Sequence, residues 1–200
     1  MKRTLDASWP WSALIGVLLP ASRAWLESDM ARHMLLQLPL LLIIGAGLAN
    51  ALPGAWRKVI ATFNAHGANG LLLASLVLGF WMLPRALDDA VLSPPVALAK
   101  YASLLLAGMA LRLSWRAAGV VVQLFFVGNW AWMSATVGLL YQSLPQRLCS
   151  VYLADQQVVA GQGLVVMALL VPIAWLSFSG ARGELIGDEA APHLPTRADA

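Results

Sequence analysis

The chain alternates between long apolar stretches and short polar connections. Runs such as 71–83, broken only by Ser75, and 120–127, broken only by Gln123, lack the polar–apolar alternation of membrane β-strands. A helix needs roughly 20 apolar residues to cross the hydrocarbon core of a bilayer. Clear stretches of this kind are Met34–Pro53, Gly67–Leu83, Pro95–Leu113, Ala118–Tyr141 and Val158–Phe178. The pattern predicts an all-α fold, a polytopic helical membrane bundle.

A shorter apolar stretch precedes these five, running from Trp9 to Pro20 and extending through Leu26. Two interpretations stay open. Small residues at 21–24 are typical of a signal-peptide cleavage site, whereas Trp9-Pro10-Trp11 resembles the aromatic anchor of a short first transmembrane helix. We expect an uncleaved helix, which gives about six spans in a single domain over 1–180. The tail, 181–200, has four acidic residues and no apolar periodicity, and we expect it to be disordered and cytoplasmic.

Composition restricts the classes of function. Sixty per cent of the residues are hydrophobic and 12% are charged, whereas a soluble domain has roughly a quarter of its residues charged. A net charge of +3 is ordinary for a protein whose connections meet anionic lipid, so we expect no nucleic-acid partner. The single cysteine, Cys149, excludes an intrachain disulfide and a multi-cysteine metal cluster. Only His33 and His66 lie near spans, at opposite membrane faces, so we expect no haem.

Lys and Arg are unevenly distributed between the two predicted membrane faces. One face collects Lys2, Arg3, Arg57, Lys58, Arg112, Arg116, Arg182 and Arg197. The other has only Arg23, Arg32, Arg85 and Arg147. Because cytoplasmic connections carry the excess of Lys and Arg, the first face is predicted to be cytoplasmic, together with both termini. The extracytoplasmic face then gathers Glu27, Asp29, His33, Asp88, Asp89 and Asp155.

The start of the second span has the composition of a metal site. Helical spacing places Asp29, His33 and Gln37 on one face, with Met30 beside them and Met34 a little further round. Thioether and imidazole groups together suit Cu(I), and a carboxylate shifts the preference toward Cu(II) or another divalent ion. The alternative is that Asp29 stabilises the helix start and His33 is its hydrogen-bond partner.

Four further features lie at the ends of the predicted spans or inside them. The third span ends at Trp81-Met82-Leu83-Pro84, and the last begins with Asp155-Gln156-Gln157, where Asp155 is predicted to be an N-cap. Lys100 lies inside the fourth span, where we expect an internal salt bridge with Asp88 or Asp89. Asn129, in the middle of the fifth span, is predicted to hydrogen-bond across helices.

Three of these segments together resemble the CtaG-type cytochrome c oxidase assembly factors, a family of bacterial multi-span proteins associated with copper delivery. The family's His-Met-x-x-His-Met-Leu-Leu corresponds to Asp29–Leu36, its Trp-His-x-Pro to Trp81–Pro84, and its Asp-Gln-Gln-x-Ala-Gly to Asp155–Gly161 with one residue of slack. Asp29 and Met82 stand where the family has histidines, and a histidine pair expected at the start of the fourth span is absent. The chain is therefore similar to a divergent, shortened member.

The resemblance implies a non-enzymatic assembly or copper-handling factor of the bacterial inner membrane, whose partner is a respiratory haem-copper oxidase or related copper enzyme. The implied extracytoplasmic Cu(I) site contains His33, Met30, Met34, Asp29, Met82 and Asp155. The alternative is a metal-free structural subunit of a larger membrane complex, in which Gly45, Gly47, Gly161 and Gly163 mediate packing. A transporter is less favoured because internal repeats and paired broken helices are not evident.

Overall fold

The computed structural model describes residues 8–144 and 146–181, and in these ranges it contains helices, turns and short connections but no strands. The helices are α1 (Trp9–Leu18), α2 (Pro20–Glu27), α3 (Met30–Arg32), a π-helix η1 (His33–Gln37), α4 (Leu38–Leu48), a 3₁₀ turn η2 (Ala49–Ala51), α5 (Gly54–Phe63), α6 (Ala68–Trp81), α7 (Pro84–Leu92), α8 (Pro94–Trp115), α9 (Val120–Ser143) and α10 (Ala154–Ala181). The predicted all-helical class is confirmed. The predicted tail, from 182 onward, lies outside the described residues.

Within the described residues, four helical segments are long and apolar enough to cross a membrane: Met30–Ala51, Pro94–Trp115, Val120–Ser143 and Ala154–Ser179. The bent pair α5–α6 raises the number to five if it forms one broken span. The predicted first span, which would make six, is not confirmed, because α1 has only 10 residues. Leu19 is extended and Pro20 opens a new helix, since a proline cannot continue the hydrogen-bond ladder of the helix before it.

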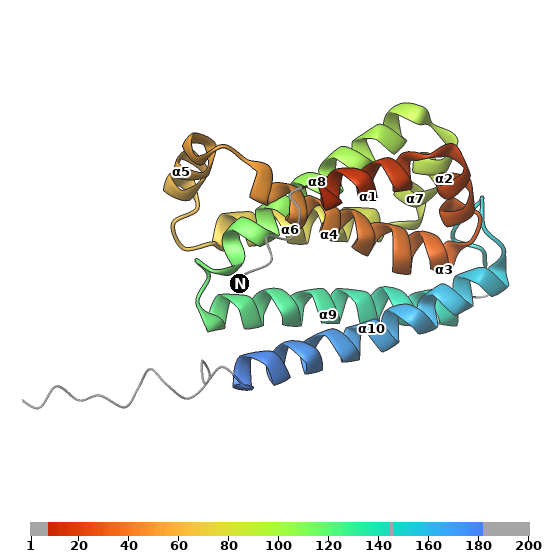
Figure 1. Cartoon of the computed structure of the whole chain (residues 1–200). Coiled ribbons are helices and arrows are strands. Elements are labelled where there is room, and N and C mark those ends of the chain that lie inside the picture. The colour runs from red at the N-terminus through yellow and green to blue at the C-terminus, as the bar shows by residue number, and fades with distance from the viewer. Residues whose placement is uncertain (1–7, 145, 182–200) are drawn as a thin grey trace, which may run out of the picture.

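The third predicted span is shorter than its apolar pattern suggests and begins at a sharp bend. α5 meets α6 at 90°. Gly67, at φ 70°, precedes α6, and a side chain here would also overlap the backbone of Ser114. α5 lies across one end of the bundle (Figure 1), and its Trp56 and Phe63 are 63% and 75% exposed. This helix was not among the predicted spans.

Glycines bring two helix pairs into close contact. A Cβ on Gly45 of α4 would overlap the backbone of Leu105 in α8. A Cβ on Gly161 of α10 would lie 2.6 Å from the carbonyl oxygen of Gly138 in α9. Gly45 and Gly161 therefore let helices of this chain approach closely, because small residues bring helix backbones together. The packing against a larger complex that was predicted for these glycines stays a prediction.

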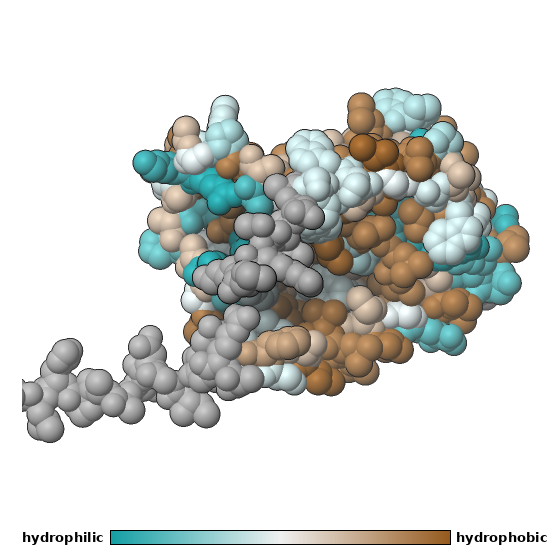
Figure 2. All heavy atoms as spheres, viewed as in Figure 1, coloured by the Kyte–Doolittle hydropathy of each residue, from teal (hydrophilic) through white to brown (hydrophobic). Residues whose placement is uncertain are grey.

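The bundle has two distinct ends. α5 marks one end, where α4 ends and α9 begins, and α7 marks the other, where α3 and α10 begin (Figure 1). Apolar side chains cover much of the side of the bundle, and hydrophilic ones gather toward both ends (Figure 2). This distribution is the one expected of helices that cross a bilayer. We refer below to the α5 end and the α7 end.

Candidate functional site: a buried polar network

Lys100 lies at the centre of a polar network in the α7 half of the bundle. Its side chain is fully buried, and its ammonium group has three hydrogen-bond partners. Nζ lies 2.8 Å from Glu27 Oε1, 2.8 Å from His33 Nε2 and 3.0 Å from Gln37 Oε1. An ammonium group has three donors and no acceptor, so Lys100 is fully satisfied. The predicted internal salt bridge is confirmed, but its partner is Glu27 rather than Asp88 or Asp89.

The same geometry assigns the tautomer of His33. Because the ammonium of Lys100 can only donate, Nε2 of His33 must accept, and the ring proton is on Nδ1. Nδ1 lies 2.6 Å from the hydroxyl oxygen of Tyr152, which in turn donates to the backbone carbonyl of Glu27 at 3.0 Å. His33 is therefore neutral and fully buried, with both ring nitrogens hydrogen-bonded within the protein.

Glu27 collects the remaining donors. Its Oε1 accepts from Tyr101 at 3.1 Å and from Gln37 Nε2 at 3.3 Å, and its Oε2 pairs with Arg23 Nε at 2.9 Å. Burial raises the pKa of this carboxyl group, but the hydrogen bonds and charges of Lys100 and Arg23 outweigh burial and lower the pKa to about 2. Glu27 is therefore ionised, and the network contains an ion pair with satisfied hydrogen bonds.

A π-helix places His33 and Gln37 toward Lys100. In η1 the Leu38 backbone N–H donates to the carbonyl of His33, five residues back. The cause is close in sequence: Pro39 has no N–H for the carbonyl of Leu35, so a regular α-helical ladder cannot pass through it. At the helix start, Asp29 Oδ1 accepts from the backbone N–H groups of Ala31 and Arg32 at 2.9 and 3.2 Å. Asp29 is thus an N-cap.

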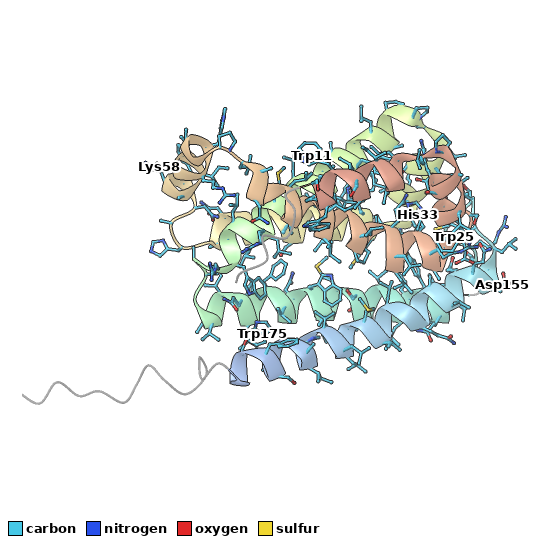
Figure 3. All side chains as sticks on the ribbon, in the orientation of Figure 1. Trp11, Trp25, His33, Lys58, Asp155 and Trp175 are labelled. Atoms are coloured by element: carbon cyan, nitrogen blue, oxygen red, sulfur yellow. The ribbon has the colours of Figure 1, made fainter. Side chains whose placement is uncertain are left out.

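The predicted copper ligands have different roles in the structure. His33 belongs to the network, through its contacts with Lys100 and Tyr152. Asp155 lies apart from His33, at the start of α10 (Figure 3). Asp155 is exposed and occupies the first turn of α10, after Ala154, so its predicted N-cap position is wrong by two residues. Asp29 is used by the backbone, and Met30 is fully buried in the core. Among the described residues, no three His, Cys, Asp or Glu side chains are grouped to hold a metal.

The surroundings of His33 do not fit a bound metal ion. The lone pair of Nε2 accepts from the Lys100 ammonium, and Nδ1 carries the proton that Tyr152 accepts. A cation at either nitrogen would have to displace one partner, and at Nε2 it would also meet the positive charge of Lys100. Hydrogen bonds within the protein thus occupy both ring nitrogens, the atoms through which an imidazole binds a metal.

Met34 and Met82 do come together. Both are nearly fully buried, and both line one apolar cavity of about 230 Å³ among η1, α4, α6, α8, α9 and α10. Met167 of α10 lines the same cavity. The carbonyl of Met82 is held by the hydroxyl group of Tyr141 at 3.0 Å. Three methionines therefore line one partly open apolar pocket, separate from the hydrogen-bond network.

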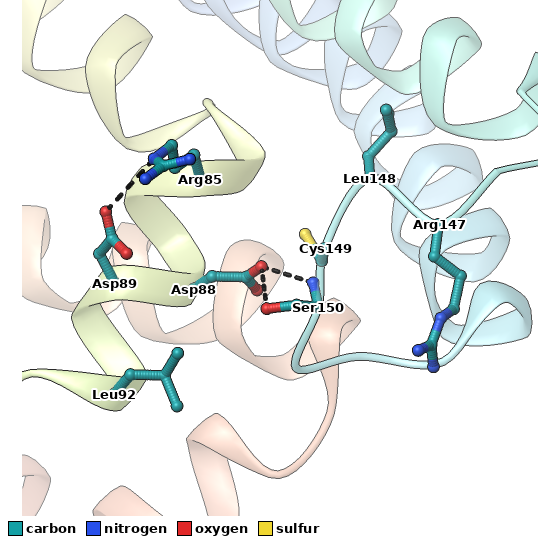
Figure 4. Close-up of a pocket in the computed structure, with 8 residues that line it drawn as sticks. All are labelled: Arg85, Asp88, Asp89, Leu92, Arg147, Leu148, Cys149 and Ser150. Carbon is teal, nitrogen blue, oxygen red and sulfur yellow. Dashed lines mark hydrogen bonds and ion pairs between the residues drawn. The ribbon is translucent and has the colours of Figure 1, made fainter.

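A second polar cluster ties α7 to the connection before α10. Asp88 Oδ2 accepts from the backbone N–H of Ser150 at 2.5 Å and from its hydroxyl group at 2.9 Å, beside a pocket that Arg85 and Arg147 also line (Figure 4). Cys149 is buried here, and burial, with the nearby Asp88 carboxylate, raises its pKa to about 12. Asp88 therefore holds the connection before α10 against α7, and the thiol of Cys149 stays protonated.

Sequence reasoning missed several members of these clusters. Tyr101 and Tyr152 carried no motif, although a tyrosine next to a lysine inside a span is itself a polar signal. Gln157 belongs to the Asp-Gln-Gln segment, and the structure shows its role: its amide donates to the carbonyl of Tyr141 at 3.1 Å and accepts from the N–H of Leu148 at 2.8 Å. The segment joins α9, α10 and their connection.

The predicted gathering of the acidic segments is confirmed at the level of the bundle. Glu27, Asp88 and Asp155 all lie toward the α7 end (Figure 1). Comparisons with protein-family models, with curated proteins and with solved structures find no match to this chain. The similarity to CtaG-type assembly factors accordingly stays a prediction from the three motifs. Over the part of the chain that the structure describes, the fold is all-helical, with four or five segments that can span a membrane.

Proposed function

We propose that this protein is a membrane-embedded assembly or structural subunit that acts by binding another membrane protein, without a metal at His33. The observation that supports this proposal is the complete use of His33 by Lys100 and Tyr152 within a satisfied network. Such a network fixes the positions of α2, η1, α8 and the connection before α10 relative to one another. A preorganised surface binds a partner at a lower entropic cost than a flexible one.

The client class comes from the resemblance alone. CtaG-type factors assist respiratory haem-copper oxidases, so the proposed client is such an oxidase or a related copper enzyme of the bacterial inner membrane. The experiment is deletion of the gene, followed by complementation with the parent and with His33→Gln. Glutamine keeps a hydrogen-bonding group at this position but removes the imidazole.

We expect the deletion to lower haem-copper oxidase activity in isolated membranes, and His33→Gln to restore it to within about twofold of the parent. Protein level and melting temperature in detergent must match for the two forms. Full oxidase activity in the deletion strain would contradict the proposed client. Loss of maturation with a stably folded His33→Gln protein would show instead that the imidazole is needed.

Copper handling is the second candidate, and the shared cavity of Met34, Met82 and Met167 favours it. Thioether groups are soft ligands that select Cu(I). The test is anaerobic Cu(I) loading of the detergent-purified protein, then desalting and copper analysis. Copper handling predicts about one equivalent in the parent and a large loss in Met34→Leu/Met82→Leu. Met133→Leu is the matched control, because Met133 lines a different surface.

A further inference from the structure

A groove runs along the outside of the bundle between α6 and α9. It encloses about 670 Å³ and is lined along most of α6, from Ala68 to just beyond its end at Leu83. On α9 the lining residues follow a helical stripe, Val122, Phe125, Phe126, Asn129 and Met133. Leu76 and Phe125 are 64% and 77% exposed. The groove therefore follows the helix direction and opens toward the surroundings of the bundle.

One polar side chain in this groove lacks a strong partner. Asn129 was predicted to hydrogen-bond across helices, but its amide donates to the thioether of Met133 on its own helix at 3.4 Å. A thioether is a weak acceptor, and no other hydrogen bond of this side chain is found within the described ranges. Asn129 lies about 14 Å along α9 from Val120, near the middle of a hydrocarbon core.

The position of Asn129 indicates what occupies the groove. Hydrocarbon chains have no hydrogen-bonding group, so an amide that faces them at this depth stays unsatisfied. A neighbouring transmembrane helix can supply both the apolar surface and the polar partner. We propose that the occupant is a second copy of this chain, and that two copies form a symmetric dimer through their α6–α9 grooves with the two Asn129 side chains paired.

Symmetry is the reason for choosing a second copy. All copies insert in the same orientation, so the two-fold axis of a dimer is parallel to the membrane normal and identical residues lie at the same depth. An asparagine amide has both a donor and an acceptor, so two of them can form a reciprocal pair. Phe125, one turn away on the same stripe, projects from each copy and can fill the partner's groove.

Cysteine cross-linking in native membranes tests the interface. Phe125→Cys and Leu124→Cys are each introduced into a Cys149→Ala background and treated with a short bismaleimide. Leu124 is the matched control because it is 53% exposed and adjacent in the chain but is not among the residues that line the groove. We expect a strong band of twice the monomer mass for Phe125→Cys and at least a fivefold weaker one for Leu124→Cys.

The role of the amide is tested separately by Förster transfer in proteoliposomes, with donor and acceptor dyes on Lys58→Cys. We expect Asn129→Leu to lower the dimer association constant by roughly five- to tenfold, the range for one or two interhelical hydrogen bonds in a bilayer. Leu139→Ala, on an exposed residue that does not line the groove, is expected to leave the constant unchanged.

Equal cross-linking of both cysteine variants, or none in either, would overturn the dimer. Cross-linking of Phe125→Cys to a different protein would assign the groove to that protein instead. An unchanged constant for Asn129→Leu would overturn the pairing of the amides. The dimer goes beyond the proposed function and is independent of it: cross-linking does not depend on oxidase maturation, and a deletion phenotype does not depend on a dimer.

Discussion

At the scale of single residues, Lys100 shows what a full positive charge requires inside an apolar bundle. Transfer of an unpaired ammonium group from water to a low-dielectric interior costs several kcal/mol, so the surrounding groups must compensate for it. Here one carboxylate, one imidazole and one amide each accept a hydrogen bond from its three N–H groups, so every donor has a partner. Removing one partner of the Glu27–Lys100 pair therefore costs more stability than removing both, because the remaining charge stays buried without its counter-charge.

Lys100→Met tests this asymmetry. Methionine has a similar volume, but it leaves Glu27 with only Arg23, which is partly exposed, as a counter-charge. We expect a loss of about 3–5 kcal/mol in unfolding free energy, measured by denaturation in mixed detergent micelles. The double variant Glu27→Gln/Lys100→Met should lose less than the sum of the single variants. Arg85→Met is the control, since it removes an exposed pair and should cost at most about 1 kcal/mol.

The stability of the network also has a defined pH dependence. The pKa of Glu27 falls from its ordinary value near 4.5 to about 2 on folding, so its contribution is complete above pH 4.5 and is lost as pH falls toward 2. We expect the melting-temperature gap between the parent and Glu27→Gln to be constant from pH 7 to 5 and to narrow below that. A gap that already narrows between pH 7 and 5 would contradict an ionised, paired Glu27. Asp89→Asn, at an exposed carboxylate, should show little gap throughout.

At the scale of helices, glycines determine how closely the helices pack. Replacing two of them by alanine is expected to change stability in opposite directions. Gly161→Ala places a methyl group 2.6 Å from the carbonyl oxygen of Gly138, so α9 and α10 must separate. We expect a loss of about 1–3 kcal/mol. Gly128→Ala meets no atom within 4 Å and should gain about 0.5–1 kcal/mol from helix propensity. Thermal unfolding of both variants in one detergent measures the contrast, and equal effects would contradict the close crossing.

The sequence was sufficient to predict the long apolar helices but few of their contacts. Apolar length identifies α4, α8, α9 and α10, because the hydrocarbon core requires roughly 20 apolar residues regardless of what packs beside them. It also identified Lys100 as a salt-bridge residue, since a charge at this depth needs a partner. The partner itself was not predictable. Glu27 and Lys100 are 73 residues apart, and their contact depends on the order of helices around the bundle.

The predicted copper site shows the same limit of sequence reasoning at particular residues. Helical periodicity placed His33 and Gln37 on one face, and in the structure both contact Lys100. Periodicity cannot indicate that a lysine from another helix hydrogen-bonds to the imidazole nitrogen of His33. Nor can it indicate that the Asp29 carboxylate accepts hydrogen bonds from backbone N–H groups. Met34 and Met82 were predicted to lie together and do share a cavity, but His33 points elsewhere, into the network.

At the scale of the whole molecule, charge is divided between the two ends in an unusual way. In the described ranges, the acidic residues Glu27, Asp29, Asp88, Asp89 and Asp155 all belong to segments at the α7 end. Within the same ranges, the charged residues at the α5 end are all cationic: Arg57, Lys58, Arg112 and Arg116. The α7 end has four arginines of its own, Arg23, Arg32, Arg85 and Arg147. Over these ranges the number of Lys and Arg therefore does not distinguish the ends.

Orientation in the membrane consequently depends on the four remaining cations, Lys2, Arg3, Arg182 and Arg197, and on where the chain places them. Topology follows Lys and Arg near the ends of spans and depends little on acidic residues, so the predicted orientation has the α5 end in the cytoplasm. Single-cysteine variants test this in intact cells. Asp89→Cys should react with a membrane-impermeant maleimide from outside, whereas Lys58→Cys should react only after the membrane is permeabilised. Cys149 in the parent should stay unlabelled in both conditions, because it is buried and its pKa is about 12. The reverse labelling pattern would place the buried network toward the cytoplasm and would exclude an extracytoplasmic role for Met82 and Asp155.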